Sequence, residues 1–197
     1  MKTGEHGRQN QPLGPAAWEQ VRLPDILAPG LDIVFVGYNP GRWSARQGHH
    51  FAGPGNHFWA LLAEAGITPQ RLTPADDAAL LRYGLGVTNI VARPSPGSGD
   101  LSYDELLQGG ALLVEKLKPL KPRIVCLLGK DVYRGYAGLP KTRAVSWGAA
   151  ESARIPGCVD FTAPNPSPRS TIPRAQRLEI MRQLQALRRD RCGFREE

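Results

Sequence analysis

Cysteine is scarce in this chain, and its spacing excludes several kinds of metal site. The 197 residues include three cysteines, Cys126, Cys158 and Cys192, each more than thirty residues from the next. That spacing builds neither a CxxC zinc ribbon nor a four-cysteine iron–sulfur site. An odd, sparse set of thiols also argues against a disulfide framework, so we expect a reducing, cytoplasmic compartment.

Long apolar runs and several familiar catalytic motifs are missing as well. No apolar stretch approaches the ~18 residues that span a bilayer, and the polar residues 1–15 contain no apolar core of a secretory signal. We therefore expect neither a membrane protein nor an exported one. The sequence also lacks a GxxxxGK[ST] phosphate loop, a GxGxxG dinucleotide fingerprint and a GxSxG nucleophile elbow.

Short apolar blocks alternate with helical patterns along the chain. The blocks that are typical of strands lie at 32–37, 86–91, 123–128, 144–147 and 159–163. Apolar residues at helical spacing predict helices at 54–66, 102–117, 130–136 and 170–190. This alternation predicts an α/β fold, namely a three-layer α/β/α sandwich around a largely parallel sheet.

The chain is long enough for one well-packed domain and too short for two. Its mass is 21.5 kDa, with 41% hydrophobic and 22% charged residues, the balance of a soluble globular protein. We expect a single domain at 15–191. A disordered segment rich in Gly, Gln and Asn is expected at 1–14, and a C-terminal tail at 192–197.

Acidic residues are absent from three separate windows. None of the 18 Asp and Glu residues lies in 33–63, 78–99 or 161–178. The loops at 38–53, 92–99 and 164–169 in these windows all follow expected strands, so we expect them to converge on one edge of the sheet, where ligands bind outside the carboxyl ends of the strands. With a formal net charge of +7, this pattern favours a nucleic-acid partner over an Arg-rich composition without a polyanionic ligand. The arginines in these loops are Arg42, Arg46, Arg93 and Arg169.

A sharp turn follows the first expected strand, in the sequence Gly37-Tyr38-Asn39-Pro40-Gly41. Asn-Pro-Gly is a turn signal, and a turn alone would explain the segment. The functional interpretation is that Asn39 points from the rigid end of the strand into a pocket. An amide both donates and accepts hydrogen bonds, so Asn39 could hold a water molecule there.

Three of the four histidines, His49, His50 and His57, lie within nine residues. The clustering suggests a metal, but the segment has no carboxylate or thiolate, and its spacing does not place the rings on one helical face. We therefore expect no metal site. The preferred interpretation is a polar loop that presents Phe51 as a stacking surface for a nucleobase.

The segment 164–170, with the sequence PNPSPRS, is a proline-braced loop before the last expected helix. It could be a simple connector between a strand and a helix. The functional interpretation is that proline removes flexibility, so that Arg169 can be inserted into a duplex as a wedge. Ser170 or Thr171 would cap the helix, whose N-terminus could bind phosphate.

The tryptophans and the C-terminal arginines are assigned structural roles. Trp59 falls on the apolar face of its helix, and Trp43 and Trp147 are also expected to pack rather than to contact a ligand. The arginines between 174 and 195 are expected to form a solvated helix face, and contact with DNA is the alternative interpretation.

Two blocks near the N-terminus, 37–41 and GHHFAGPGNHFW at 48–59, resemble the mismatch-specific uracil/thymine-DNA glycosylases of the uracil-DNA glycosylase superfamily. The resemblance covers roughly residues 31 to 185, and these two blocks are highly specific. The chain is identified on this basis as a member of that family. Further matching segments are Gly86–Val91, Pro96-Gly97, Asp100–Ser102, Gly109-Gly110, Lys121–Ile124, Gly129-Lys130, Pro164–Ser167 and Pro173–Gln176.

The resemblance implies a monofunctional base-excision enzyme without a metal or another cofactor. Such an enzyme flips uracil or thymine out of a G·U or G·T mispair, hydrolyses the N-glycosidic bond and leaves an abasic site. Asn39 matches the family's water-positioning asparagine, and Phe51 matches the aromatic partner of the flipped base. Asn89 matches a pyrimidine-contacting position where some members have lysine, and Arg169 matches the wedge, which is leucine or arginine.

We expect further residues around these to take part. Tyr38 and His50 are expected to contact the base, and Arg42, Arg93, Ser167 and Ser170 to contact the DNA backbone. The implied partner is double-stranded DNA with a mispaired or damaged pyrimidine. A monomer is expected to bind it, in the cytoplasm and in association with the nucleoid.

One position departs from the family pattern. The arginine at 93 is usually preceded by Asp or Glu, and here Ala92 precedes it. An acid at this catalytic position could activate the water or stabilise the developing sugar cation, so we expect Ala92 to lower activity. An isolated departure among matching neighbours is typical of an engineered substitution. The alanine at position 92 also keeps open an alternative function, namely a DNA-binding module that senses mispairs without cleaving the N-glycosidic bond.

Overall fold

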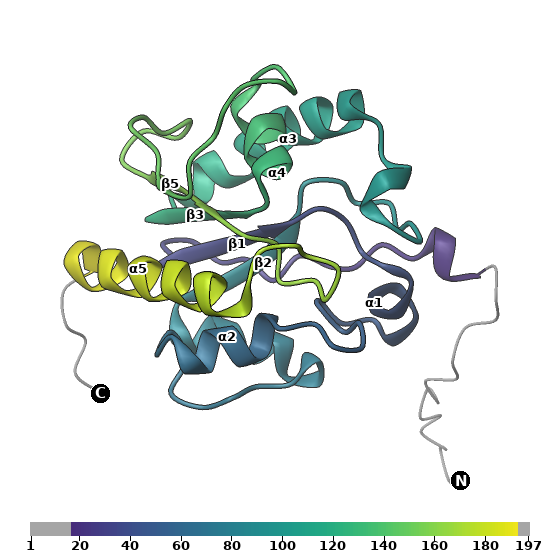
Figure 1. Ribbon diagram of the computed structural model, residues 1–197, viewed down its shortest axis with the longest axis horizontal. Helices are drawn as coiled ribbons and strands as arrows, with labels where there is room; N and C mark the ends of the chain where they lie inside the picture. Colours follow the sequence, from purple (N-terminus) through teal and green to yellow (C-terminus); the bar gives the residue numbers. More distant parts are fainter. Residues whose placement is uncertain (1–16, 193–197) are drawn as a thin grey trace, which may run out of the picture.

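A five-stranded sheet forms the centre of the molecule (Figure 1). In the computed structural model, which describes residues 17–192, the strand order is β2-β1-β3-β5-β4, and β4 alone runs antiparallel to its neighbour. The disordered segment expected at 1–14 and the tail beyond residue 192 lie outside the described residues. The strands are β1 (Ile33–Gly37), β2 (Leu85–Asn89), β3 (Ile124–Leu128), β4 (Gly148–Ala149) and β5 (Val159–Ala163).

Helices cover both faces of the sheet. One face packs against α2 (Phe58–Glu64), the 3₁₀ helix η2 (Pro74–Tyr83) and α5 (Arg174–Cys192). The other packs against α3 (Tyr103–Leu117) and α4 (Lys130–Ala137). Alternate residues of β1 enter the two cores, because successive side chains of a strand point to opposite faces.

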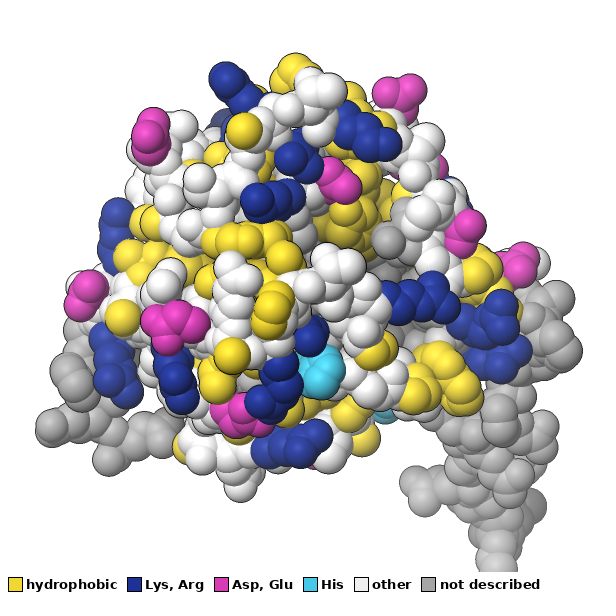
Figure 2. Space-filling model, viewed as in Figure 1, with side chains coloured by type: hydrophobic (Ala, Val, Ile, Leu, Met, Phe, Trp, Pro, Cys, Tyr) yellow, Lys and Arg dark blue, Asp and Glu magenta, His cyan; other side chains and the backbone are white. Residues whose placement is uncertain are grey.

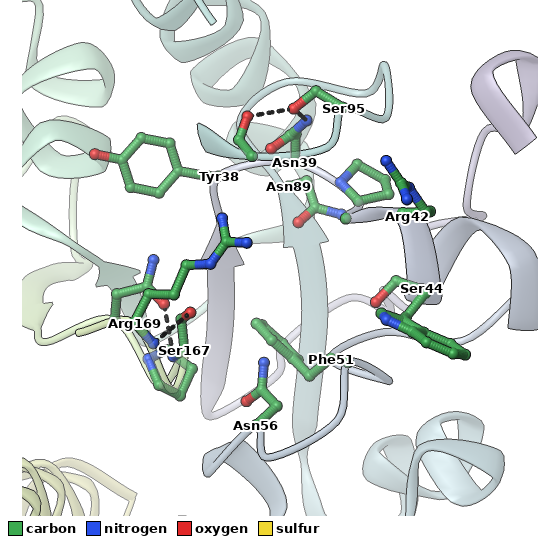
Figure 3. A pocket seen from close by; sticks show the side chains of 18 of the residues that line it. Tyr38, Asn39, Arg42, Ser44, Phe51, Asn56, Asn89, Ser95, Ser167 and Arg169 are labelled. Atoms are coloured by element: carbon green, nitrogen blue, oxygen red, sulfur yellow. Dashed lines mark hydrogen bonds between the residues drawn. The ribbon is translucent and has the colours of Figure 1, made fainter. Parts of the chain in front are cut away.

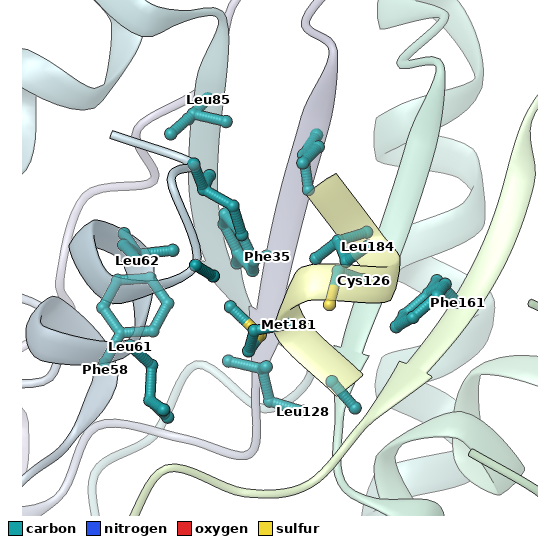
Figure 4. Close-up of a cluster of buried hydrophobic side chains, with 14 of the residues drawn as sticks. Phe35, Phe58, Leu61, Leu62, Leu85, Cys126, Leu128, Phe161, Met181 and Leu184 are labelled. Carbon is teal, nitrogen blue, oxygen red and sulfur yellow. The ribbon is translucent and has the colours of Figure 1, made fainter. Parts of the chain in front are cut away.

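The three-layer α/β/α sandwich predicted from the sequence is confirmed. Figure 4 shows the first core, where Phe35 and Leu85 of the sheet lie against side chains of α2 and α5. The strands are almost continuously apolar because both faces of a parallel sheet are covered. Within residues 17–192, no helix combines the length and apolar character needed to cross a membrane.

Glycines bring α3 close to the segment that leaves β2. A Cβ atom on Gly109 would lie 2.1 Å from the carbonyl oxygen of Ile90, and one on Gly110 would lie 2.2 Å from that of Gly135 in α4. Only glycine permits these backbone approaches. They fix the start of the loop after β2, and hence one wall of the pocket described below.

Several boundaries differ from those predicted. The prediction of a strand at 144–147 is wrong. Pairing with β5 begins only at Gly148, and Trp147 packs against the first core. The last helix begins at Arg174 rather than at 170, because Pro173 disfavours a helical conformation in the residue before it. Ser170 and Thr171 therefore do not cap this helix. The helix expected from Pro54 begins at Phe58, and the short helix α1 (Arg42–Gln47) was not predicted.

Candidate active site

A pocket of about 850 Å³ opens at the carboxyl ends of the central strands. Its walls come mainly from the segments 37–56, 89–100 and 165–170, so the expectation that the three acid-poor loops converge on one edge is confirmed. Among the described lining residues, Asp100 is the one acid. Its carboxylate accepts a hydrogen bond from the backbone N–H of Gly97 at 2.8 Å.

Gly37, at the end of β1, forms the floor of the pocket. A Cβ atom there would lie 2.7 Å from Oδ1 of Asn89 and 3.5 Å from the ring of Phe51. Gly37 and Asn89 are direct partners in the parallel pairing of β1 and β2. The missing side chain thus leaves room for the Asn89 amide and the Phe51 ring, both of which line the pocket (Figure 3). The amide of Asn89 has no hydrogen-bond partner in the part of the chain that the structure describes.

Phe51 is held in a strained backbone conformation. Its φ of 51° lies in the left-handed region, which costs a non-glycine residue ~1–3 kcal/mol. The ring stacks on Phe58, with centroids 3.9 Å apart and planes 25° apart, and Phe58 in turn packs edge-on against Phe35. The core therefore fixes one face of Phe51, and the half-buried ring presents itself to the pocket.

The orientation of the Asn39 amide is determined by its partners. Nδ2 donates to the carbonyl oxygen of Arg93 at 3.0 Å and to Oγ of Ser95 at 2.8 Å. Ser95 uses its own proton on the carbonyl oxygen of Gly97, at 2.6 Å. Because a carbonyl only accepts, the NH₂ group of Asn39 must face these partners. Oδ1 of Asn39, in the lining of the pocket, is left to accept a hydrogen bond from a water molecule.

Tyr38 and His50 line the same pocket as neutral groups. The Tyr38 hydroxyl donates to Oδ2 of Asp131 at 3.1 Å, and burial together with Asp131 raises the pKa of Tyr38. His50 is 3% exposed, and burial lowers its pKa. Nε2 of His50 lies 3.0 Å from the carbonyl oxygen of Pro24, an acceptor, so this nitrogen carries the proton of the neutral ring.

The proline-braced loop is anchored from two sides. The backbone N–H of His57 donates to the carbonyl oxygen of Pro166 at 3.0 Å. Nη1 of Arg177, a side chain only 6% exposed, donates to the carbonyl oxygen of Ser167 at 3.3 Å. The Ser167 hydroxyl accepts from the N–H of Arg169. The exposed Arg169 side chain extends over the pocket (Figure 3), close to the turn at Gly97.

The structure gives three predicted site residues, Arg93, Ala92 and Arg42, contacts or positions that the sequence did not predict. Arg93 is outside the pocket lining, with its guanidinium bound to both carboxylate oxygens of Glu105 at 2.5 and 3.0 Å. This contact lowers the pKa of Glu105 to about 2. Ala92 is exposed and also outside the lining. Arg42, by contrast, lies at the mouth, with its guanidinium 5.6 Å from the ring centroid of Trp18.

The pocket also contains residues that the sequence analysis missed. Ser95 fixes the orientation of the Asn39 amide, and no local pattern in the loop at 94–99 indicates this contact.

Trp43 was expected to pack, and that prediction is wrong, because its side chain is 49% exposed and lines the pocket. Trp59 lies in the core as predicted. Ser167, Ser170 and Arg169 all line the pocket.

Charge is spread over the surface rather than gathered in one patch on the face in Figure 2, where acidic side chains lie between basic ones. The pocket differs, since its lining combines Arg42 and Arg169 with neutral amides, hydroxyls and aromatic rings. Within residues 17–192, no three His, Cys, Asp or Glu side chains are grouped as metal ligands would be. Such a lining suits a polar, uncharged ligand attached to an anionic chain.

A family model described as the uracil DNA glycosylase superfamily matches residues 24–187. The match includes the three segments that form most of the walls of the pocket.

Proposed function

The chain belongs to the uracil DNA glycosylase superfamily, whose members are base-excision hydrolases that act on DNA, and we propose that it removes uracil or thymine from G·U and G·T mispairs. In this proposal it is a monofunctional glycosylase that acts as a monomer on double-stranded DNA in the cytoplasm. The observation that carries the proposal is the oriented amide of Asn39 in one pocket with the ring of Phe51 and the unpartnered amide of Asn89.

The floor of the pocket suits a pyrimidine with an imide edge. Uracil and thymine present a carbonyl oxygen beside an N–H, and the Asn89 amide offers a donor and an acceptor to match them. The exposed face of Phe51 would stack on the base. Neutral Tyr38 and His50 place no charge beside it. Together these groups would bind a base after it has left the helix.

Asn39 would act by positioning water rather than by taking a proton. An amide is not a base at neutral pH, so Oδ1 can only orient the water for attack on C1′ of the sugar. The bond between C1′ and the base nitrogen breaks, and its electron pair leaves with the base as a delocalised anion. The water oxygen bonds to C1′, and the proton released from the water neutralises the base. Hydrogen-bond donors in the pocket, among them Asn89, would stabilise the anion.

Selectivity would come partly from the flipping step. A mispaired base costs less to extrude than a paired one. Arg169, on its anchored loop, would occupy the space left in the helix and donate hydrogen bonds to the guanine that remains. This mechanism is expected to be slow, because the leaving ability of the base then limits the rate.

The test is base release from a panel of duplexes that carry uracil or thymine opposite each of the four bases. Release is read as alkali-labile abasic sites, in buffer containing a chelator. The proposal expects release to be fastest from G·U, slower from G·T and weakest from A·U and A·T. Tight binding to the mispairs without any release would instead support the non-cleaving, mispair-sensing module.

A further inference from the structure

The pocket mouth carries an aromatic side chain that the proposed chemistry does not use. Trp43, on α1, is 49% exposed and lines the pocket. The other two large hydrophobic residues that are exposed in the described part of the chain, Leu81 and Leu112, lie outside the pocket lining. Single exposed apolar residues are common on protein surfaces, so the exposure of Trp43 is not by itself informative. Its position in the lining of the pocket is what distinguishes it.

α1 is a rigid support for this indole. The Ser44 hydroxyl accepts a hydrogen bond from the N–H of Ala52 at 3.1 Å, which joins α1 to the loop that bears Phe51. On the other side, the Arg42 guanidinium lies over the ring of Trp18, which is buried. A side chain on a short helix fixed at both sides can present a flat surface in one place.

Trp43 also lies where a DNA strand would leave the pocket. Its sequence neighbours Arg42 and Ser44 lie on the side of the pocket opposite Arg169 (Figure 3). A flipped nucleotide bound at Phe51 and Asn89 has the wedge on one side, so its strand continues past α1 on the other. No Asp or Glu occurs between residues 33 and 63 to repel that strand.

We propose that Trp43 stacks on the nucleobase next to the flipped nucleotide in the same strand, while Arg42 contacts the phosphate between them. This inference rests on the proposed glycosylase function and extends its binding site by one nucleotide. Stacking on an indole is tolerant of sequence, because every base has a π face. In an intact duplex the neighbouring base is already stacked, so the contact benefits substrates whose flanking bases are unpaired, such as single strands.

The experiment compares Trp43→Ala and Trp43→Phe with the wild type on a single-stranded oligonucleotide containing one uracil. Leu112→Ala, which removes an exposed apolar side chain outside the pocket, is the matched control. Trp43→Ala is expected to lower kcat/KM about tenfold on this substrate, and Trp43→Phe less, since a smaller ring still stacks. The loss on a G·U duplex is expected to be smaller. The Kd for the same oligonucleotide, measured by fluorescence anisotropy, should rank the variants in the same order and does not depend on cleavage.

A second substrate tests whether the contact is to the neighbouring base. When the nucleotides on both sides of the uracil are replaced by abasic analogues, the wild type and Trp43→Ala should bind this oligonucleotide and release its uracil equally well. A loss that persists with abasic flanks, or no loss in binding on the normal oligonucleotide, overturns the inference. Failure of the proposed function itself is distinguished by the wild type, which would then release no uracil from the G·U duplex.

Discussion

Removing the Ser95 hydroxyl tests whether the orientation of Asn39 matters for catalysis. Ser95 is 2% exposed, and its Oγ accepts from Asn39 at 2.8 Å while donating to the carbonyl oxygen of Gly97 at 2.6 Å. In Ser95→Ala, one N–H of Asn39 loses its partner, while the carbonyl oxygen of Gly97 still accepts from the backbone N–H of Asp100 at 3.2 Å. The Asn39 amide is then held by one hydrogen bond, to the carbonyl oxygen of Arg93, instead of two, so its orientation is less well fixed.

The expected size of the effect follows from these contacts. A buried polar group without a partner costs ~1–3 kcal/mol. Part of this loss falls on stability, and we assign about 1.4 kcal/mol to the transition state, which is a tenfold lower rate. Because Ser95 acts only through Asn39, the double variant with Asn39→Ala should be within about twofold of Asn39→Ala alone.

The assay is single-turnover release of uracil from a G·U duplex, in which titration of the enzyme separates the maximal rate from the half-saturating enzyme concentration. Ser95→Ala should lower the maximal rate and leave the half-saturating concentration nearly unchanged. Thr73→Ala, which removes a hydroxyl at the start of η2 and outside the pocket, controls for a general loss of stability. An unchanged rate in Ser95→Ala, or additive losses in the double variant, would refute the reasoning.

Three further predictions concern other groups of the site. Arg169→Ala should lower release from G·U duplexes more than from single strands, because a wedge acts only where a gap in a helix must be filled, and similar losses on both would remove that role. Ala92 is exposed and outside the pocket lining, so Ala92→Asp tests whether an acid there reaches the sugar once DNA is bound: it should then raise cleavage of G·U duplexes by at least about tenfold with equal or weaker DNA affinity, and unchanged rates would mean that an acid has no catalytic part here. Burial lowers the pKa of His50 below its usual 6.5, so the unfolded state gains its proton first as the pH falls. The free energy of unfolding should therefore decrease below about pH 6.5, and urea titrations should show a smaller decrease in His50→Gln, whereas parallel curves would contradict a neutral, buried imidazole.

Much of the scaffold could be predicted because it depends on local patterns. The apolar block at 32–37 indicates a buried strand, and its alternate residues do enter separate cores. Three loops were expected to meet at one edge because each follows a strand and the carboxyl ends of parallel strands lie together. The absence of acidic residues from these loops marked that edge as a surface for an anionic ligand. These signals repeat over several residues, and tertiary contacts reinforce them.

The contacts that complete the site could not be predicted in the same way. The bond between Asn39 and Ser95 joins residues 56 positions apart, and nothing in either local sequence encodes the distance between them. α1 has only six residues, too few for a helical period to be visible, so Trp43 could not be assigned to the surface. Arg93 was expected to contact phosphate, but its pairing with Glu105 depends on how α3 packs against the loop after β2.

The most direct measurement is uracil release from a G·U duplex by Asn39→Ala, together with the Kd of the same variant for that duplex. If Asn39 orients the attacking water, release should fall by at least about a hundredfold. The Kd should stay within about threefold of the wild-type value, since the amide bonds to Arg93 and Ser95 rather than to phosphate. Equal losses of binding and release would show that Asn39 has a structural role, and retained release would show that the water is positioned by another group.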